Sequence, residues 1–593
     1  MSYNLYAVVR ERVLAALRVV AGELPEAVVA RVEVTPPREA GLGDMATNAA
    51  MIAAKPAHKP PRELAAALAA RLGEDALFAG AESAGPGFIN LRLRADAWET
   101  VLRAILRAGE AYGDSALGGG QRVNVEYVSA NPTGPMHIGH CRGAVVGDSL
   151  ANLLAKAGHK VTKEYYVNDA GRQVVALAWA AYWRYLQALG TPLSEEEFSA
   201  ATPDGLQYRG DYLIPVGEAL AARHGAALAG PGLAVAPPSV WLETVRGAAV
   251  AMMLESIRED LALLRVRHDV FASERALVES GTADRMIDDL RARGLIYEGV
   301  LEPPKSKVPE EWEPREQTLF RATQWGDDVD RPLRKSDGSN TYFANDIAYH
   351  AQKIAEGATH LIDILGADHG GYLPRMRAAV EAIGGATFEV VLCQIVHVLK
   401  GGQPLRMSKR AGTFITLRDL LDEVGPDAVR FTMLTRKADA QMEFDIDTAL
   451  AQTRDNPVFY VQYAHARCRS VLRAAEASLG EAAVSREALA EVVLDGLADE
   501  AEVALIRRLA QWPRLVEGAA AAREPHRIAF FLYDLAADFH MLWHRGRDDS
   551  ALRFLQADRP QETLARLALV SATAITIRSG LAVMGVTPVE EMR

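Results

Sequence analysis

The stretch from 123 to 175 constrains this chain more than any other part. Apolar and polar residues alternate from 123 to 127, a Gly/Pro-rich turn covers 131–135, and an apolar helical run then extends to about Gly158. A second apolar strand follows at 161–167. This order predicts a βαβ unit with a right-handed crossover, so the loop after the first strand lies at the carboxyl edge of a parallel sheet.

Two histidines stand at the start of the predicted helix, in the sequence His137-Ile138-Gly139-His140. A helix N-terminus offers unpaired N–H groups and partial positive charge, and Gly139 leaves the backbone open to a flat ring. The imidazoles can donate to phosphate oxygens, which suits a nucleoside triphosphate. On these residues alone, histidines that only cap or pack the helix remain an alternative.

A short basic segment lies about 270 residues further on, from Leu405 to Thr413. It combines basic residues with a small hydroxyl residue and a glycine, the composition expected of a mobile clamp over developing charge on pyrophosphate. Taken alone, it is also compatible with a solvated basic turn.

Together, His137–His140 and Met407-Ser408-Lys409 resemble the two signature motifs of class I aminoacyl-tRNA synthetases. The resemblance is narrower still, because the chain resembles the bacterial arginyl-tRNA synthetases over nearly its whole length. Four segments carry this resemblance in their sequence: Glu126–Asp148, Tyr342–His350, Gly366–Met376 and Tyr460–Arg467. The resemblance implies that arginine and ATP form an arginyl-adenylate, and that the arginyl group then passes to the 3′-terminal ribose of the cognate tRNA.

The resemblance also implies roles for individual residues. The implied catalytic residues are His137, His140, Ser408 and Lys409. The implied ATP-binding residues are His137, Gly139, His140, Gly366, Asp368, His369, Met407, Ser408 and Lys409. The implied arginine-binding residues are Glu126, Asn131, His137, Tyr342 and Asp346. Arg406 stands where the family has the first lysine of the basic segment, which keeps the charge but changes its shape.

Residue chemistry supports the implied specificity at one point. Tyr342 and Asp346 are four residues apart in an apolar, aromatic segment, so in a helix they share one face. A carboxylate there is costly unless a cation pairs with it, and a substrate guanidinium would be that cation. An internal salt bridge to one of the chain's arginines is the alternative.

The chain is predicted to be a multidomain α/β protein whose catalytic core is a doubly wound, Rossmann-like parallel sheet. The predicted domains are a small α+β domain at 1–117, the catalytic domain at 118–455 with a helical insertion at about 176–330, and an all-α domain at 456–593. The N-terminal module is predicted as helix 3–22, strand 32–34, helices 46–54 and 62–72, and strand 88–93. The resemblance implies that this module contacts the tRNA elbow.

The C-terminal domain is predicted as helices 460–476, 489–511, 527–545 and 563–584, which resemble the family's anticodon-binding domain. The candidate tRNA-binding residues there are Tyr460, Tyr463, Arg467, Phe539 and Trp543. Core packing is the alternative for each ring. The net charge of −12 gives no basic footprint for the whole chain, although arginines cluster in this quarter.

Composition limits the remaining classes. No signal-peptide pattern and no uncharged apolar run of membrane-spanning length occur, so we expect a cytoplasmic protein without a membrane partner. A monomer is expected as well. Three widely spaced cysteines argue against disulfides and structural zinc, and Mg²⁺ is expected only together with ATP. Neither G-x-G-x-x-G nor a P-loop occurs. Two alternatives stay open: another adenylate-forming ligase, and an inactive relative that only binds tRNA.

Overall fold

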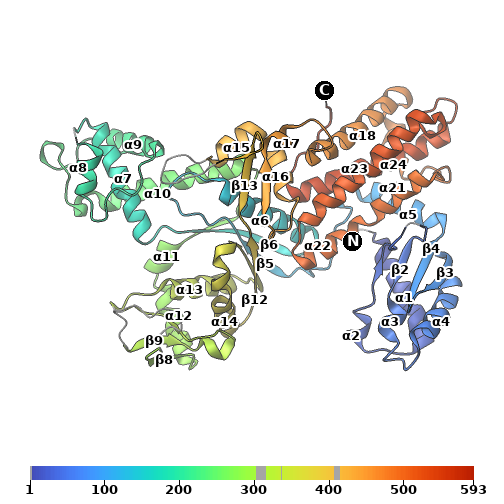
Figure 1. Cartoon of the computed structure of the whole chain (residues 1–593), viewed down its shortest axis with the longest axis horizontal. Helices are drawn as coiled ribbons and strands as arrows, with labels where there is room; N and C mark the ends of the chain where they lie inside the picture. Colours follow the sequence, from blue (N-terminus) through green and yellow to red (C-terminus); the bar gives the residue numbers. More distant parts are fainter. Residues whose placement is uncertain are drawn as a thin grey trace. The chain divides into compact units, whose positions relative to one another are not determined.

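The computed structural model describes residues 3–39, 41–191, 193–301, 315–335, 337–405 and 415–592. Its contacts divide the chain into two compact units (Figure 1). Unit 1 consists of Met1–Gly119, Lys156–Gly158 and Ala451–Arg593, and unit 2 of Gly120–Ala155 and His159–Leu450.

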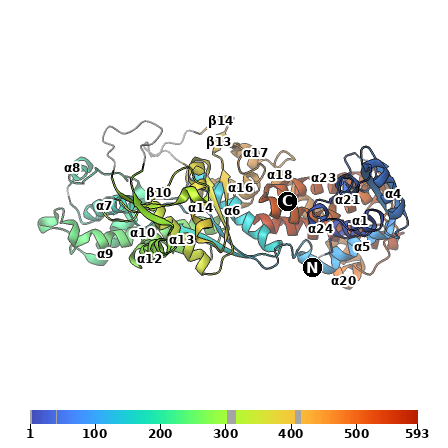
Figure 2. The same ribbon diagram turned by 90° about the horizontal axis from the view of Figure 1, so that it is seen from below.

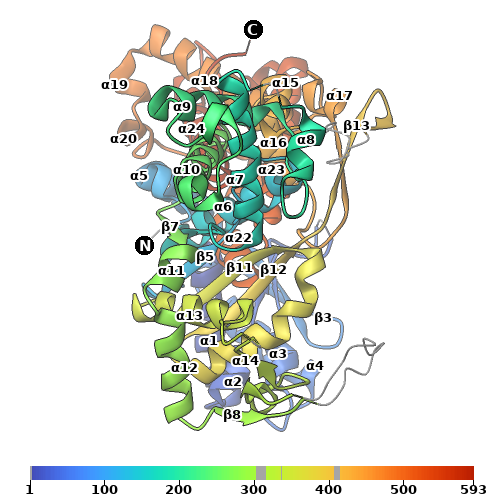
Figure 3. The ribbon, with the colours of Figure 1, turned by 90° about the vertical axis from the view of Figure 1, so that its left-hand side faces the viewer.

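Unit 2 is built on a five-stranded sheet in the order β12-β11-β5-β6-β7. Every neighbouring pair is parallel. The strands are β5 (Arg122–Glu126), β6 (Lys160–Val167), β7 (Val270–Ser273), β11 (His360–Gly366) and β12 (Thr387–Cys393). The chain proceeds from β5 outward through β6 to β7, and then returns to the other side of β5 with β11 and β12 (Figure 3). The predicted doubly wound sheet is therefore confirmed, with its switch point between β5 and β11.

Both faces of β5 are buried, which explains its alternating pattern. Tyr127, just past the strand, packs against Gly147 of α6 (Ile138–Lys156) on one face. On the other face, Asn124 and Glu126 are buried beneath α13 (Tyr342–Ala355). The polar half of the alternation thus belongs to an internal polar layer and not to a solvent-facing surface.

The predicted insertion consists mostly of helices with their own hydrophobic core. These elements are α7 (Arg172–Ala188), α8 (Glu195–Ala200), η2 (Asp211–Leu213), α9 (Ile214–His224), η3 (Pro231–Leu233) and α10 (Pro238–Leu263). The span predicted as insertion also contains β7, which belongs to the main sheet. With four residues and no apolar alternation, this edge strand carries little signal in the sequence.

A small antiparallel sheet, β10-β9-β8, follows β7 along the chain. Its surrounding elements are α11 (Glu274–Glu279), α12 (Thr282–Ala292), β8 (Ile296–Gly299), β9 (Gln317–Phe320), η4 (Ala322–Trp325) and β10 (Arg331–Pro332). The unit is completed by η5 (Ala367–Tyr372), α14 (Leu373–Ile383), β13 (Val396–Lys400), β14 (Gln403–Pro404), α15 (Leu417–Val424), α16 (Pro426–Met433), β15 (Met442–Asp445) and α17 (Ile446–Leu450). The loop expected near 303–315 lies almost wholly outside the described residues.

The N-terminal part of unit 1 is the predicted α+β module, with two more strands than expected. Its elements are α1 (Leu5–Ala21), α2 (Glu26–Val29), β1 (Val34–Thr35), β2 (Met45–Thr47), α3 (Ala49–Ala53), α4 (Pro61–Gly73), β3 (Phe78–Ala84) and β4 (Phe88–Leu93). The strands form an antiparallel sheet in the order β1-β2-β4-β3. The sequence hides β3 because most of its side chains are small, and β2 because it has only three residues.

The C-terminal part of unit 1 is helical, as predicted. Its helices are α18 (Pro457–Leu479), α19 (Glu481–Val484), α20 (Arg486–Leu489), α21 (Glu500–Ala510), α22 (Trp512–Ala522), α23 (His526–Asp548) and α24 (Pro560–Met584), with η7 (Ser550–Leu552) between the last two. The predicted single helix 489–511 is wrong, because the chain leaves α20 at Leu489 and re-enters a helix only at Glu500, where Asp499 caps it. By length and composition α24 alone among the described helices is apolar enough to cross a membrane, yet 83% of that stretch is buried.

The two parts of unit 1 are joined through α5 (Ala95–Ala108), which is followed by η1 (Gly109–Ala111). In Figure 2, α5 lies beside α24 and α20, and it also contacts α21. The Tyr112 hydroxyl donates to the Leu509 carbonyl at 3.0 Å, and the Trp512 indole N–H donates to the Tyr112 carbonyl at 3.0 Å. The N-terminal module and the C-terminal helices therefore share buried hydrogen bonds.

Close packing of α6 on β5 gives the first prediction. A Cβ at Gly147 would lie 2.4 Å from the Tyr127 ring, whereas one at Gly143 in the same helix meets nothing within 4 Å. We expect Gly147→Ala to reduce stability by about 1–3 kcal/mol through overpacking. Gly143→Ala is the matched control and should stabilise the helix by up to about 1 kcal/mol. Urea unfolding of both variants checks this, and equal midpoints would contradict the packing argument.

Candidate active site

The chain leaves β5 through a strained turn at the switch point of the sheet. Val128 and Ser129 have φ values of +72° and +41°. Such conformations cost about 1–3 kcal/mol each and persist only where the surroundings fix them. The Ser129 hydroxyl donates to Glu126 Oε1 at 2.9 Å and accepts from the Tyr166 N–H at 3.0 Å. These contacts bind the turn to β5 and β6, and so fix where the following loop begins.

The predicted histidine pair lies at the N-terminus of α6, as the sequence indicated. The rings of His137 and His140 are 4.0 Å apart between centroids. His137 Nδ1 accepts from the Gly139 N–H at 3.1 Å. A Cβ at Gly139 would lie 2.8 Å from the His137 ring, so only glycine permits this packing. The arrangement places two imidazoles and a helix N-terminus at one point.

The segment from Arg406 to Phe414 lies outside the described residues, and with it the candidates Met407, Ser408 and Lys409. The residues that follow it are described. The Leu417 N–H donates to the Met136 carbonyl at 2.8 Å, and Thr416 forms a β-bridge with His137. The chain just after the basic segment therefore lies directly beside the histidine motif, although about 270 residues separate them in sequence.

The second half of the sheet supplies the glycine-rich candidates. Gly366 ends β11, and Asp368 and His369 lie in η5, immediately beyond the carboxyl end of that strand. A Cβ at Gly366 would lie 2.7 Å from Asp368 Oδ1. The side chains of Asp368 and His369 are mostly exposed and pair with each other at 3.1 Å. These residues and the histidine motif thus follow the two strands that flank the switch point.

Asp346 has an unusual environment on α13. Its carboxylate is partly buried and accepts from the Tyr372 hydroxyl at 2.5 Å. Burial raises the pKa of Asp346 to about 6, even though the hydroxyl opposes the shift. No arginine or lysine within the described part of the chain forms an ion pair with it, so the internal salt bridge considered from the sequence is not formed there. Tyr342 is one turn earlier on the same face and is 65% exposed.

Glu126 is the centre of a row of three carboxylates. In the parallel ladder it is the register partner of Asp363 on β11 and of Glu164 on β6. Register partners in a parallel sheet point to the same face, and all three residues are buried there. Asn131, at the turn before α6, is exposed and donates to Gln173 at 2.7 Å. Glu126 ends β5, and Asn131 lies in the loop that connects β5 to α6.

Two cations that face this row of carboxylates were not predicted from the sequence. Lys353, only 1% exposed, donates to Glu126 Oε2 at 2.5 Å and lies 3.5 Å from Asp363 Oδ1. His350 has one ring nitrogen 2.8 Å from the Asp346 carbonyl and the other 3.1 Å from Asp363 Oδ2. Because both neighbours are acceptors, the ring fits best as an imidazolium. Asp346, His350 and Lys353 follow helical spacing, and this polar stripe in an apolar helix was the available signal.

In unit 1 the candidate tRNA-binding residues come together on α18 and α23. The Arg467 guanidinium lies over the Tyr463 ring at 4.1 Å and over the Trp543 ring at 4.8 Å. It also donates to the Tyr463 hydroxyl at 2.9 Å. The Tyr460 ring, half-buried, packs on His540. Tyr463, Arg467 and Trp543 thus form one partly exposed cluster, called the Arg467 cluster below.

Phe539 differs from the other aromatic candidates. It is fully buried and stacks on Phe554 with centroids 5.8 Å apart. Its ring lies below Trp543 in the core, at a centroid distance of 6.3 Å. In this conformation no base can reach it, so packing is the role that the structure gives Phe539.

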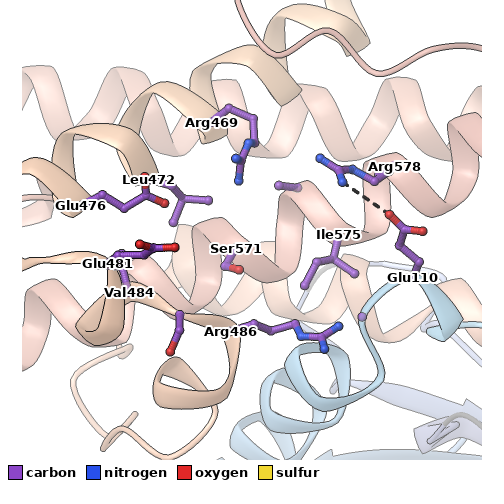
Figure 4. A pocket seen from close by; sticks show the side chains of 13 residues that line it. Glu110, Arg469, Leu472, Glu476, Glu481, Val484, Arg486, Ser571, Ile575 and Arg578 are labelled. Atoms are coloured by element: carbon purple, nitrogen blue, oxygen red, sulfur yellow. Dashed lines mark hydrogen bonds and ion pairs between the residues drawn. The ribbon is translucent and has the colours of Figure 1, made fainter.

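Most arginines of the predicted basic clusters are engaged by acidic groups of the same chain. Arg469 pairs with Glu590 at 2.6 Å, Arg508 with Asp538 at 2.8 Å, and Arg545 with Asp499 at 2.6 Å. A cavity of about 330 Å³ between α18, α24 and η1 repeats the pattern (Figure 4). Arg578 on its wall pairs with Glu110 and Glu590. The arginines of these clusters are thus largely paired with acidic residues of the same chain. This explains why their clustering in the sequence is only weak evidence for a nucleic-acid-binding surface.

The described residues contain no group of three His, Cys, Asp or Glu side chains that could hold a metal ion. Cys141, Cys393 and Cys468 are buried free thiols, and burial raises the pKa of each, to about 12 for Cys141 and Cys393.

Comparison with known proteins agrees with this geometry. Three family models match: "Arginyl tRNA synthetase N terminal domain" at residues 7–93, "tRNA synthetases class I (R), catalytic domain" at 101–188, and "DALR anticodon binding domain" at 461–592. A doubly wound sheet with the histidine motif at its switch point, joined to such domains, defines a class I aminoacyl-tRNA synthetase.

The similarity to individual relatives shows to which family within this class the chain belongs. The chain is 63% identical to the arginine–tRNA ligase of Gluconobacter oxydans over 99% of its length and 98% of the relative, and 55% identical to that of Ruegeria pomeroyi over the full length of both. A Campylobacter jejuni arginyl-tRNA synthetase structure matches with 30% identity and a TM-score of 0.68, covering 84% of this chain and 99% of that one. The Thermus thermophilus enzyme shares the fold, with a TM-score of 0.73 at 22% identity over 99% of this chain and 100% of that one. The chain belongs to the arginyl-tRNA synthetase family.

Proposed function

We propose that this protein ligates L-arginine to its cognate tRNA in two steps. The arginine carboxylate attacks the α-phosphorus of ATP, which forms arginyl-adenylate and releases pyrophosphate. The 3′-terminal ribose of the tRNA then takes the arginyl group, and AMP leaves. No covalent enzyme intermediate is needed, so catalysis consists of positioning and charge stabilisation.

The observation that carries this proposal is the carboxylate of Asp346. It lies partly buried, with the Tyr372 hydroxyl as its donor and no basic partner among the described residues. A planar guanidinium can pair with it through two parallel hydrogen bonds, which an ammonium cannot do. Because a buried, unpaired carboxylate penalises a substrate without that cation, binding alone selects arginine.

The catalytic roles follow from the two motifs. His137 and His140 contact the phosphates of ATP at the N-terminus of α6, with Gly139 leaving room for the nucleotide. Ser408 and Lys409 act on the departing pyrophosphate, and Mg²⁺ arrives bound to ATP. Gly366, Asp368 and His369 line the nucleotide side of the switch point, with Met407 from the basic segment. Arg406 replaces the family's first lysine there and keeps its positive charge.

The remaining partners fit the rest of the chain. Glu126 and Asn131 hold the amino acid, and His137 lies near its carboxylate. Tyr342 and Asp346 receive the guanidinium. Tyr460, Tyr463, Arg467 and Trp543 meet the anticodon loop, and the N-terminal module meets the tRNA elbow. The domain division at 1–117, 118–455 and 456–593, a monomeric state and a cytoplasmic location complete the proposal.

ATP–pyrophosphate exchange with each amino acid, with and without tRNA, tests the function. We expect exchange with arginine, little with lysine or citrulline, and dependence on cognate tRNA. A non-tRNA adenylate-forming ligase would exchange without tRNA and would not charge it. An inactive relative would show no exchange with any amino acid. Equal turnover of lysine and arginine would refute the assignment of Asp346.

The pKa of Asp346 gives a pH prediction. With a pKa of about 6, the carboxyl is ionised above that pH and neutral below it. Only the ionised form pairs with guanidinium, so KM for arginine should rise as pH falls through about 6. Asp346→Asn should raise KM at every pH, with a loss on the order of 3 kcal/mol in kcat/KM, and should abolish the step. An unchanged pH profile in this variant would assign the step to another group.

The Arg467 cluster gives a prediction for tRNA recognition. Stacking of a base on an exposed ring is worth roughly 1–3 kcal/mol, so Trp543→Ala should weaken directly measured tRNA binding by a corresponding amount. The loss should be smaller for a tRNA with an altered anticodon loop. Phe539→Leu is the matched control on the same helix, because its buried ring should affect the melting temperature more than tRNA affinity. If Trp543→Ala only lowers the melting temperature, Trp543 is a core residue.

A further inference from the structure

Lys353 is a buried residue of unit 2 to which the proposed function assigns no role. Its ammonium is buried in unit 2, 2.5 Å from Glu126 and 3.5 Å from Asp363, and 4.3 Å from the centre of the Tyr349 ring. A buried lysine is costly unless charges and hydrogen bonds compensate it. Here the compensation comes from two carboxylates on adjacent strands, one of which, Glu126, is a proposed ligand of the substrate arginine.

Charged and titratable groups from several elements face this ammonium or its neighbours. They are Glu126 at the end of β5, Glu164 and Tyr166 on β6, Asp363 on β11, Asp346, Tyr349 and His350 on α13, and Tyr372 in η5, and Glu274 at the start of α11 adds a sixth element. Tyr349 donates to Glu164 at 2.7 Å, and Asn124 donates to its other oxygen. The layer therefore holds five carboxyl groups, buried Glu274 included, against two bases, Lys353 and His350.

This excess of carboxyl groups suits a cationic substrate. Arginine carries two positive groups, an α-ammonium and a guanidinium, and the layer holds more carboxyl groups than bases. Asp346 faces the proposed guanidinium position, and Glu126 faces the strained turn at the switch point. One oxygen of Glu126 accepts from Lys353 and the other from the Ser129 hydroxyl. Its carboxylate is thus fixed from two sides before substrate arrives.

We propose that Lys353 is a positioning residue for arginine activation: its ammonium holds the Glu126 carboxylate charged and correctly oriented for the cationic substrate. This inference rests on the proposed function. Lys353 is 1% exposed and bonded to Glu126, so it acts through that carboxylate. Burial raises the pKa of Glu126, and the Lys353 ammonium is the largest influence that opposes this rise. Without Lys353 the carboxyl would therefore be protonated at higher pH.

The test compares Lys353→Met, which keeps the length of the stem but removes the charge, with the wild-type enzyme in tRNA-dependent exchange. We expect KM for arginine to rise by at least about tenfold near neutral pH, while KM for ATP changes by less than about twofold. The variant should also gain a second pH dependence, at higher pH than the Asp346 step near pH 6 that the wild type shows: its KM for arginine should continue to fall as pH rises and Glu126 ionises. A rise in both KM values together, without this pH dependence, would overturn the proposal.

A double-variant cycle separates positioning from a structural role. If Lys353 acts through Glu126, adding Lys353→Met to Glu126→Gln should raise KM for arginine by less than about threefold beyond Glu126→Gln alone. Independent, multiplicative effects would overturn the proposal. Lys163→Met is the matched control, since Lys163 pairs with buried Asp148 at 2.7 Å elsewhere in the unit. It should lower stability without a selective effect on arginine.

Lys353→Arg keeps the assay informative if Lys353→Met does not fold. It retains the charge but replaces a compact ammonium with a larger fork, which should displace Glu126 and raise KM for arginine several-fold with a near-native melting temperature. A wild-type KM in folded Lys353→Arg would overturn the proposal. Wild-type enzyme that activates no amino acid would instead refute the proposed function, so the two failures are distinguishable.

Discussion

Three carboxylates in register across β11, β5 and β6 impose the central constraint on unit 2. Asp363, Glu126 and Glu164 are neighbours on one buried face, where like charges repel and lose their hydration. Lys353 resolves most of this conflict by pairing with two of them. Burial of these charges is tolerable because the other oxygens accept hydrogen bonds from Ser129, Tyr349, Asn124 and His350. The position of α13 over the sheet thus depends on charge pairing as well as on apolar packing.

The elements that could be predicted from the sequence are those whose residue pattern lies within the element itself and its flanking turns. The βαβ unit from 123 to 167 combines strand alternation, a glycine-rich turn and a long apolar helix, and each signal is independent of the rest of the fold. Elements that depend on distant partners were missed. The edge strand β7 has four residues and becomes a strand only through pairing with β6, and β3 is mostly composed of small side chains. The break between α20 and α21 was missed because the residues around 490–499 do not contain proline.

The residues of the candidate site also fall into those with a local pattern in the sequence and those that depend on distant partners. The spacing of His137, Gly139 and His140 indicates a helix N-terminus. Asp346 is recognisable in the sequence because it is a carboxylate in an apolar helix. Lys353 was not recognised because its partner, Glu126, is 227 residues away and only the parallel register brings the two together. Tyr372 was missed for a similar reason, since its hydrogen bond reaches from η5 to α13. In unit 1, arginines that suggested a nucleic-acid footprint proved to be bonded to this chain's own glutamates and aspartates.

The strained turn after β5 connects the buried charges to the chemistry. Val128 and Ser129 adopt positive φ, and the turn is held because Ser129 bonds simultaneously to Glu126 and to β6. The same carboxylate that pairs with Lys353 therefore also anchors the loop that leads to Asn131 and the histidine motif. A shift of Glu126 would act on the proposed amino-acid pocket directly, and on the proposed ATP-binding motif through the turn.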